Sequence, residues 1–248
     1  MDPLDRHDKH GKNNKIALQF SGGKDSLACL YLMRPYWDKI TVFWLNTGAA
    51  PPSAVSRMNE IRAIVPHFVE CASDQPKDIE ANGYPVDILP LRTTAGNLMF
   101  EEHDGIRLQP YMACCANNIW IPMHNAMREM GITLIIRGQR NSDHRKALIR
   151  SGQSMDGFEV YFPLEDWTED AVFQYLRDNE IKIPPHYAYG TSSVDCWNCT
   201  AYLYENQGRG AYLREAEPEL YPKFMHVMKQ IRSEVARETN FIDRVIHG

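Results

Sequence analysis

Short, continuously apolar stretches alternate with amphipathic ones through the first two-thirds of the chain. The apolar stretches lie at 15–20, 40–46, 67–72, 86–91 and 132–138. Unbroken apolar character over so few residues is typical of strands covered on both faces of a parallel sheet. Segments with helical spacing separate several of them, at 26–34, 54–65 and 115–130. This order predicts a doubly wound, mostly parallel α/β sheet, whose ligands bind beyond the carboxyl ends of the strands.

The pattern changes after residue 138. Residues 139–157 are polar, and Thr168 is the predicted N-cap of a helix with Glu169 and Asp170 in its first turn. A proline-rich loop at 183–190 ends that helix, and a long helix is expected at 217–238. We therefore expect a flexible N-terminal tail at 1–14, one main domain at 15–205, and a C-terminal helical extension of the same domain at 206–248.

Composition and charge narrow the class of protein. The formal net charge of −5 argues against a protein that coats nucleic acid, although a local basic patch remains compatible with binding it. No apolar run approaches the roughly 18 residues that cross a bilayer, and the first residues lack the apolar core of a signal peptide. We expect a cytoplasmic protein without a membrane partner, in which cysteines serve as metal ligands, reactive thiols or core residues rather than disulfides.

The stretch SGGKDS at 21–26 stands between the first predicted strand and the first predicted helix. A glycine turn followed by a helix start directs backbone N–H groups and the positive end of the helix dipole at one point, where an anion can bind. Lys24 adds a full charge, and Ser21 and Ser26 add hydroxyl donors. The spacing fits neither a Walker A loop nor a GxGxxG fingerprint. The alternative is a plain tight turn, so the pattern predicts a phosphate site without naming the phosphate.

Four of the six cysteines form two close pairs. Cys114 and Cys115 are adjacent, while Cys196 and Cys199 form a CxxC. Four thiolates suit a tetrahedral sulfur site or an iron–sulfur cluster, and adjacent cysteines favour a cubane because it offers each a separate iron. Cys29 and Cys71 are assigned to the core.

A basic run follows the last predicted strand of the sheet. It contains Arg140, His144, Arg145, Lys146 and Arg150. These side chains suit a polyphosphate, a sulfate or a nucleic-acid backbone, and the alternative is an ordinary solvated loop.

The motifs resemble those of known families. SGGKDS resembles the PP-loop of the ATP-pyrophosphatases, a Rossmann-like superfamily. The paired cysteines, RGQRNSDHRKA, FPLEDWTEDAVFQYL, IPPHYAYG and DCWNCTAY are similar to the iron–sulfur branch of the adenylyl-sulfate and phosphoadenylyl-sulfate (PAPS) reductase family, from about residue 15 to 205.

The resemblance implies roles for individual residues. The nucleotide-binding residues would be Ser21, Gly22, Gly23, Lys24, Asp25, Ser26, Asn46, Thr47, Gly48 and Gly138. Lys24, Asp25, Arg140 and Arg145 would carry the catalysis, with Asp25 helping to hold Mg²⁺. Cys114, Cys115, Cys196 and Cys199 would hold a 4Fe–4S cluster. Family reductases often have Asp at the position of Asn46.

One family feature is missing, which leaves three functions open. Family reductases carry a nucleophilic cysteine in a C-terminal tail, and this chain has no cysteine after Cys199. The favoured hypothesis is an ATP pyrophosphatase that adenylates a substrate for sulfur transfer, of the DNA phosphorothioation or RNA thiolation type. Its partners would be a sulfur donor such as a cysteine desulfurase, a nucleic-acid acceptor and a second copy of the chain as a homodimer. The alternatives are a thioredoxin-dependent adenylyl-sulfate or PAPS reductase, and a non-catalytic nucleotide and iron–sulfur sensing module.

Overall fold

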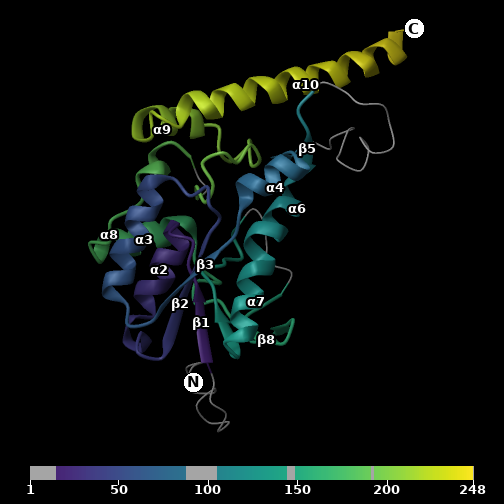
Figure 1. Cartoon of the computed structure of the whole chain (residues 1–248). Helices are drawn as coiled ribbons and strands as arrows, with labels where there is room; N and C mark the ends of the chain where they lie inside the picture. Colours follow the sequence, from purple (N-terminus) through teal and green to yellow (C-terminus); the bar gives the residue numbers. More distant parts are fainter. Residues whose placement is uncertain (1–14, 88–104, 144–148, 191–192, 248) are drawn as a thin grey trace.

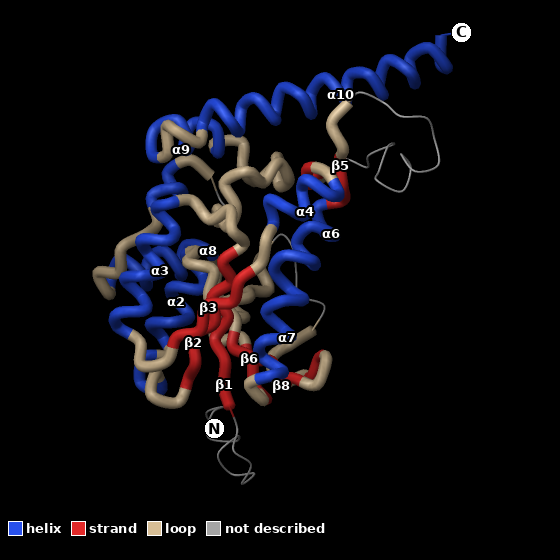
Figure 2. Tube along the Cα trace, in the orientation of Figure 1, coloured by secondary structure: helices blue, strands red, loops and turns tan. Residues whose placement is uncertain are grey.

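A six-stranded sheet forms the centre of the molecule in the computed structural model, which describes residues 15–87, 105–143, 149–190 and 193–247. Its strands run in the order β3-β2-β1-β6-β8-β7, and every pair is parallel except β7 with β8 (Figures 1 and 2). The bounds are β1 Lys15–Gln19, β2 Ile40–Asn46, β3 Phe68–Ala72, β6 Ile132–Ile136, β7 Ser154–Met155 and β8 Phe158–Tyr161. The predicted doubly wound, mostly parallel α/β fold is confirmed.

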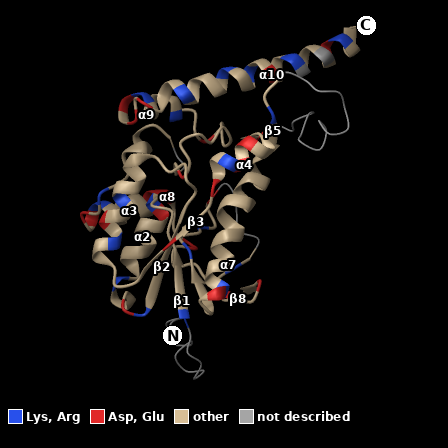
Figure 3. Cartoon of the chain, viewed as in Figure 1, with Lys and Arg blue, Asp and Glu red and all other residues tan. Residues whose placement is uncertain are grey.

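Helices cover both faces of this sheet. One face packs on α2 (Lys24–Leu32), α3 (Pro52–Ile64) and α8 (Glu169–Asp178), and the other packs on α7 (Ile121–Glu129). Alternate residues of each strand point to opposite faces. Leu18 therefore belongs to the first apolar cluster, while Ala17 belongs to the second. Figure 3 shows most of the Lys, Arg, Asp and Glu residues on helices and loops rather than on the strands of the sheet.

The apolar stretch at 86–91 does not join the main sheet, contrary to the prediction. Its described part ends β4 (Tyr84–Val86), which pairs in parallel with β5 (Leu108–Pro110) in a separate two-stranded sheet, and residues 88–91 lie outside the described residues. Val86 is buried because it packs against the C-terminal helix at Val227 and Ile231. An apolar strand sequence indicates that the strand is buried, but it does not say by which element. Here helix α10 buries the strand, and the main sheet does not.

The helix expected at 115–130 begins earlier and is not uniform. It consists of α6 (Tyr111–Cys115), a π-helical segment η2 (Ala116–Trp120) and α7. Such π-helical turns occur often at functional sites, because the wider turn shifts the register of the side chains that follow. Here the wide turn directly follows the paired cysteines.

The remaining helices are short except for the last. The predicted N-cap of α8 is confirmed, since Thr168 Oγ1 accepts from the Ala171 N–H at 3.2 Å. An unpredicted helix, α4 (Gln75–Asn82), is capped by Asp74, whose side chain accepts from the Lys77 N–H at 3.1 Å. The other elements are η1 Arg34–Tyr36, η3 Pro185–Ala188, α9 Arg209–Ala216 and α10 Tyr221–His247.

The long C-terminal helix starts later and continues further than the predicted 217–238. Helix α10 packs on α9 and on the small β4–β5 sheet, and its last turns extend away from the main sheet (Figure 1). Within the described residues, no helix is both long and apolar enough to span a bilayer. The predicted flexible tail at 1–14 lies outside the described residues.

Candidate functional site

The loop from Ser21 to Gly23 connects β1 to α2 as predicted. Gly22 has a φ of +79°, a left-handed conformation that favours glycine. The Ser21 and Ser26 hydroxyls lie 3.3 Å apart, and Ser26 Oγ donates to the Gly23 carbonyl at 3.0 Å. These contacts fix the turn that leads into the N-terminus of α2, the end of a helix that favours an anion. We refer to residues 21–26 as the phosphate loop.

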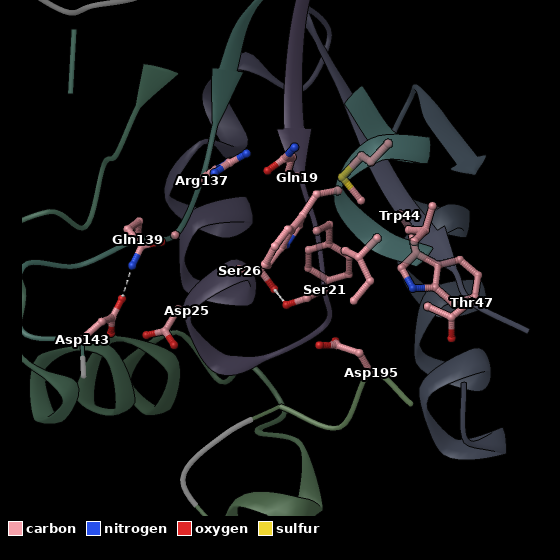
Figure 4. Close-up of a pocket in the computed structure, with 16 residues that line it drawn as sticks. Gln19, Ser21, Asp25, Ser26, Trp44, Thr47, Arg137, Gln139, Asp143 and Asp195 are labelled. Carbon is pink, nitrogen blue, oxygen red and sulfur yellow. Dashed lines mark hydrogen bonds between the residues drawn. The ribbon is translucent and has the colours of Figure 1, made fainter. Parts of the chain in front are cut away.

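A pocket of about 290 Å³ opens beside this loop. It lies at the carboxyl ends of β1 and β6, where the chain order of the sheet reverses, which is the usual ligand position in such folds. One wall is apolar, and the residues that form it are Trp44, Leu45, Ile119, Trp120 and Met123. Figure 4 shows Arg137 and Gln19 at one end of the pocket and Asp25 and Asp195 at the other. The pocket therefore combines apolar lining with a basic and an acidic end.

The structure brings only some of the predicted nucleotide-binding residues to this pocket. Those that line it are Ser21, Asp25, Ser26, Thr47 and Gly138. Gly22 and Gly23 line a small cavity of about 20 Å³ instead. Asn46 is engaged in contacts within the protein. Its amide donates to Glu70 at 2.9 Å, and its oxygen accepts from the Gly48 N–H at 3.1 Å.

Lys24 does not line the pocket. Its ammonium group is buried, with a side chain only 4% exposed, and lies 3.1 Å from both Asp25 Oδ2 and Glu169 Oε1. The ring of Tyr187 lies 5.0 Å from it, close enough for a cation–π contact. The Lys24 backbone N–H donates to the Tyr187 hydroxyl at 2.9 Å. In this arrangement Lys24 holds the Asp25 carboxylate, and its contact with a phosphate stays a prediction.

Arg140 also acts on Asp25. Its Nε lies 2.9 Å from Asp25 Oδ1, and its Nη2 lies 2.7 Å from Asp143. Burial raises the pKa of Asp25, and the charges of Lys24 and Arg140 act in the opposite direction. The carboxylate is thus held by two cations while one side of it faces the pocket. Arg145, His144 and Lys146 lie outside the described residues.

Gly138 is required by close packing rather than by its backbone angles. A Cβ at this position would lie 2.5 Å from the Asp25 carbonyl oxygen and 3.0 Å from the Ser26 nitrogen. The loop after β6 therefore approaches the phosphate loop as closely as backbone can. This contact joins the two halves of the sheet at the pocket.

Five polar residues of the pocket were missed by sequence reasoning. They are Gln19, Arg137, Gln139, Asp143 and Asp195. Arg137 Nη2 lies 3.2 Å from His124 Nε2, and desolvation lowers the pKa of both groups. Desolvation also raises the pKa of Asp195, although its side chain is open to the pocket. Gln19 and Arg137 stand at the ends of β1 and β6, so the strand-end rule could have found them.

The two cysteine pairs come together from distant segments. Cys114 and Cys115 end α6, and Cys196 and Cys199 lie on the loop before α9. Burial raises the pKa of Cys114 to about 12, and the charges of Cys115 and Cys199 act in the same direction. Burial also raises the pKa of Cys196, with Cys199 and Cys114 again contributing. The thiols of the two pairs therefore lie within electrostatic range of one another.

The four cysteine thiols suit a metal cluster that binds each thiol at a different metal atom. Among the described residues, no three Cys, His, Asp or Glu side chains could hold one metal ion. A cubane cluster places its irons at different corners, so four thiols need not converge on one point. Cys29 and Cys71 are buried within the apolar clusters, which agrees with their assignment to the core.

Thr47 connects the cysteines to the pocket. Its Oγ1 lies 3.1 Å from Cys196 Sγ, and the same residue lines the pocket. The Trp197 N–H donates to the Ala49 carbonyl at 2.9 Å, which fastens the CxxC loop to the loop after β2. Cys115 Sγ lies 3.8 Å from the Tyr202 hydroxyl on the opposite side. The sulfur-bearing loop is therefore a direct neighbour of the pocket.

Comparison with known proteins finds relatives of this chain. Residues 15–202 match the family model described as the phosphoadenosine phosphosulfate reductase domain. The adenosine 5'-phosphosulfate reductase of Burkholderia cepacia is 24% identical over 190 residues, which cover 76% of this chain and 71% of that protein. An uncharacterized protein of Methanocaldococcus jannaschii is 24% identical over 226 residues, and the match spans 88% of this chain but only 49% of that protein.

A solved structure shares the fold. The phosphoadenylyl-sulfate reductase of Candida auris, solved as a phosphate complex, superposes with a TM-score of 0.53 at 14% identity. The match covers 79% of this chain and 88% of the reductase.

Proposed function

Because this chain belongs to the phosphoadenosine phosphosulfate reductase domain family, whose members named above are enzymes of sulfur metabolism, we propose that it is a nucleotide-dependent enzyme of sulfur transfer. It binds ATP in the pocket beside the phosphate loop and a 4Fe–4S cluster on Cys114, Cys115, Cys196 and Cys199. It cleaves ATP to an adenylated acceptor and pyrophosphate, so that sulfur can replace the activated oxygen. DNA phosphorothioation and RNA thiolation are reactions of this type.

The contact between Thr47 and Cys196 carries this proposal. One residue lines the nucleotide pocket and touches a cysteine sulfur at 3.1 Å. A cysteine site that served stability alone would have no reason to adjoin the nucleotide. Sulfur chemistry next to an activated oxygen is what sulfur transfer needs.

The residues of the pocket have distinct tasks in this reaction. The apolar wall of Trp120 and Met123 accepts the flat adenine ring, and the phosphate loop receives the phosphates with its N–H groups. The acceptor oxygen attacks the α-phosphorus, the bond to the β-phosphate oxygen breaks, and the loop stabilises the charge of the departing pyrophosphate. Lys24 and Arg140 hold Asp25 in place from behind.

Asp25 and Asp195 fit a magnesium ion. Both are carboxylates at the same end of the pocket (Figure 4), and Mg²⁺ is commonly held by one or two carboxylates together with substrate phosphates. The bound cluster would supply electron transfer or an attachment point for sulfide.

A second candidate is reduction of adenylyl sulfate or PAPS with thioredoxin. The names of the Burkholderia and Candida proteins favour it. Against it, no described residue that lines the pocket is a cysteine, and an S-sulfo intermediate needs a thiolate.

The first experiment measures pyrophosphate release from ATP by anaerobically purified protein with Mg²⁺ and no sulfur donor. Release that is lost in Asp25→Asn and kept in the exposed control Lys182→Ala would support adenylation. Sulfite formation from adenylyl sulfate or PAPS, without pyrophosphate release from ATP, would instead establish the reductase. A cysteine desulfurase, a nucleic acid and a second copy of the chain are the partners to test next, and the cytoplasm is the expected compartment.

A further inference from the structure

A second and larger cavity lies on the other side of the cysteine loop. It has a volume of about 580 Å³ and is formed by α4, β4, the CxxC loop and the first turns of α10. The residues that give it its chemical character are Tyr84, Trp197, Asn198, Lys223, Phe224 and His226. We call it the α10 groove. Its volume falls within the range of sites that bind small ligands.

The CxxC loop forms the wall between the groove and the nucleotide pocket. Asp195 lines the pocket, Cys196 contacts Thr47, and Trp197 and Asn198 line the groove. Consecutive residues advance by at most about 3.5 Å, so Asp195 and Trp197 are no more than about 7 Å apart along the chain. The two sites are therefore close enough for neighbouring units of one chain-like ligand.

The lining selects for a planar, anionic ligand. Tyr84, Trp197 and Phe224 offer aromatic surface. At the edge of the groove, exposed Lys223 provides positive charge and exposed His226 provides a ring N–H donor. No described lining residue is acidic. The Asn198 side chain is 9% exposed, and its Oδ1 has no hydrogen-bond partner within the described residues. Aromatic rings beside cations are how proteins bind unstacked bases and their phosphates.

We propose that the α10 groove binds one unstacked nucleotide of a single-stranded nucleic acid, next to the nucleotide that is modified in the adjacent pocket. The base stacks on Trp197 and Tyr84, and the phosphate pairs with Lys223 and His226. This inference rests on the proposed function for its acceptor, and it makes that acceptor a single-stranded segment rather than a free small molecule.

The test measures the affinity of the iron-loaded protein for short fluorescein-labelled oligothymidylate and oligouridylate by anisotropy. Lys223→Glu and His226→Glu should each weaken binding about tenfold, because each replaces a favourable contact with the phosphate by a repulsive charge, and should reduce the salt dependence of binding. Lys229→Glu is the matched control, since Lys229 is exposed on the same helix and lies outside the groove. A preference for one oligonucleotide distinguishes DNA from RNA.

Two outcomes would overturn the proposal: absence of oligonucleotide binding by the unmodified protein, or equal affinity in all three variants. Trp197→Leu provides a second measurement. This variant should lose oligonucleotide binding, whereas Trp197→Phe should retain it. Both variants should keep their iron. Pyrophosphate release from ATP is measured separately, in the unmodified protein. Its absence there would refute the ATP reaction, whereas the oligonucleotide measurements judge the groove by themselves.

Discussion

Lys24 follows the two glycines of the phosphate loop, and its ammonium group is enclosed between Asp25 and Glu169. From the sequence, Lys24 is predicted to bind the phosphates, because a lysine beside a glycine turn can neutralise their negative charge. The side chain instead extends toward α8, where Glu169 occupies the first turn. A residue at the first position of a helix can point to either side, and the loop sequence does not say which.

Lys24→Ala should lower both stability and pyrophosphate release. The substitution leaves Asp25 without one of its two cations, and we expect a loss of about 2 kcal/mol, less than for a fully buried pair because Glu169 is 45% exposed. Glu169→Gln keeps the contact between Lys24 and Asp25 and should retain most activity. Urea unfolding and the pyrophosphate assay measure both effects. Unchanged activity in Lys24→Ala would remove this residue from the site.

Gly138→Ala should disturb the phosphate loop directly. The new Cβ would meet the Asp25 carbonyl at 2.5 Å, and backbone on both sides resists the shift. We expect a destabilisation of about 2 kcal/mol, as for other overpacked positions, and weaker ATP binding by calorimetry. Gly210→Ala is the control, since its Cβ would meet only the Met225 sulfur at 3.8 Å. That helix position should gain stability, by about 0.5 kcal/mol, and a similar gain at Gly138 would contradict the packing argument.

At the scale of elements, the cysteine pairs lie on two segments that are far apart in the sequence. The π-helical turn η2 follows Cys115 directly, and the CxxC loop is fastened to Ala49 through Trp197. Each pair is visible in the sequence, but their meeting depends on how α6 and the loop before α9 pack.

Cys196→Ser should abolish binding of the iron–sulfur cluster. A serine oxygen is a poor ligand for iron in such clusters, so the anaerobically purified variant should lose its brown colour and nearly all its iron and acid-labile sulfide. Cys71→Ser is the matched control, because Cys71 is buried in the core away from the set. Iron content equal to that of the unmodified protein would exclude Cys196 as a ligand.

The short helix η3 makes stability depend on pH through His186. Burial lowers the pKa of His186 from 6.5 to about 4, and the charges of Arg57, Arg209 and Lys24 act in the same direction. In the unfolded chain His186 therefore binds a proton as the pH falls below 6.5. In the folded chain His186 stays neutral until about pH 4. Stability is lost as the pH falls through this window, by about 2 kcal/mol between pH 7 and pH 5.

Urea unfolding of His186→Gln at the two pH values isolates this contribution. Glutamine cannot titrate, so the variant should lose about 2 kcal/mol less than the unmodified protein on acidification. Asp25 and Asp195 have raised pKa values and act with the opposite sign in both proteins, and the comparison cancels them. An identical loss in both proteins would contradict the burial of a neutral His186.

For the whole molecule, the distinctive feature is the free end of α10. Its first turns bury Phe224, Val227 and Ile231, whereas Val245 and Ile246 near the end are 69% and 65% exposed. Exposed apolar side chains on a projecting helix favour association with another surface. A second copy of the chain is the partner that can be tested first.

Val245→Lys should reduce association of the protein with itself without affecting its fold. Sedimentation velocity over a range of concentrations should show less dimer in the variant, while the free energy of unfolding of the monomer changes by no more than about 0.5 kcal/mol. Gln230→Lys adds the same charge on an exposed position of the same helix and serves as the control. A monomer at all concentrations for the unmodified protein would exclude the dimer.

The sequence by itself determined the parallel sheet, the turn at residues 21–26, the cap at Thr168 and the identity of the paired cysteines. Each of these depends on neighbours within a few residues, through periodicity, glycine conformation or capping. The same local reasoning placed 86–91 in the wrong sheet, because the apolar sequence of a strand does not determine which strand it pairs with. It also missed α4, whose eight residues carry little apolar pattern.

The tertiary structure decided which side chains share the site. Thr47 and Cys196 are 149 positions apart, and Lys24 contacts a tyrosine 163 positions away. The pocket collects Gln19, Arg137 and Asp195 from three separate segments. No periodicity links residues on different elements, because their contact depends on the order of the strands and on which face each helix covers. Local sequence determines which reactive side chains the chain carries. The packing of the sheet determines which of those side chains lie together in one site.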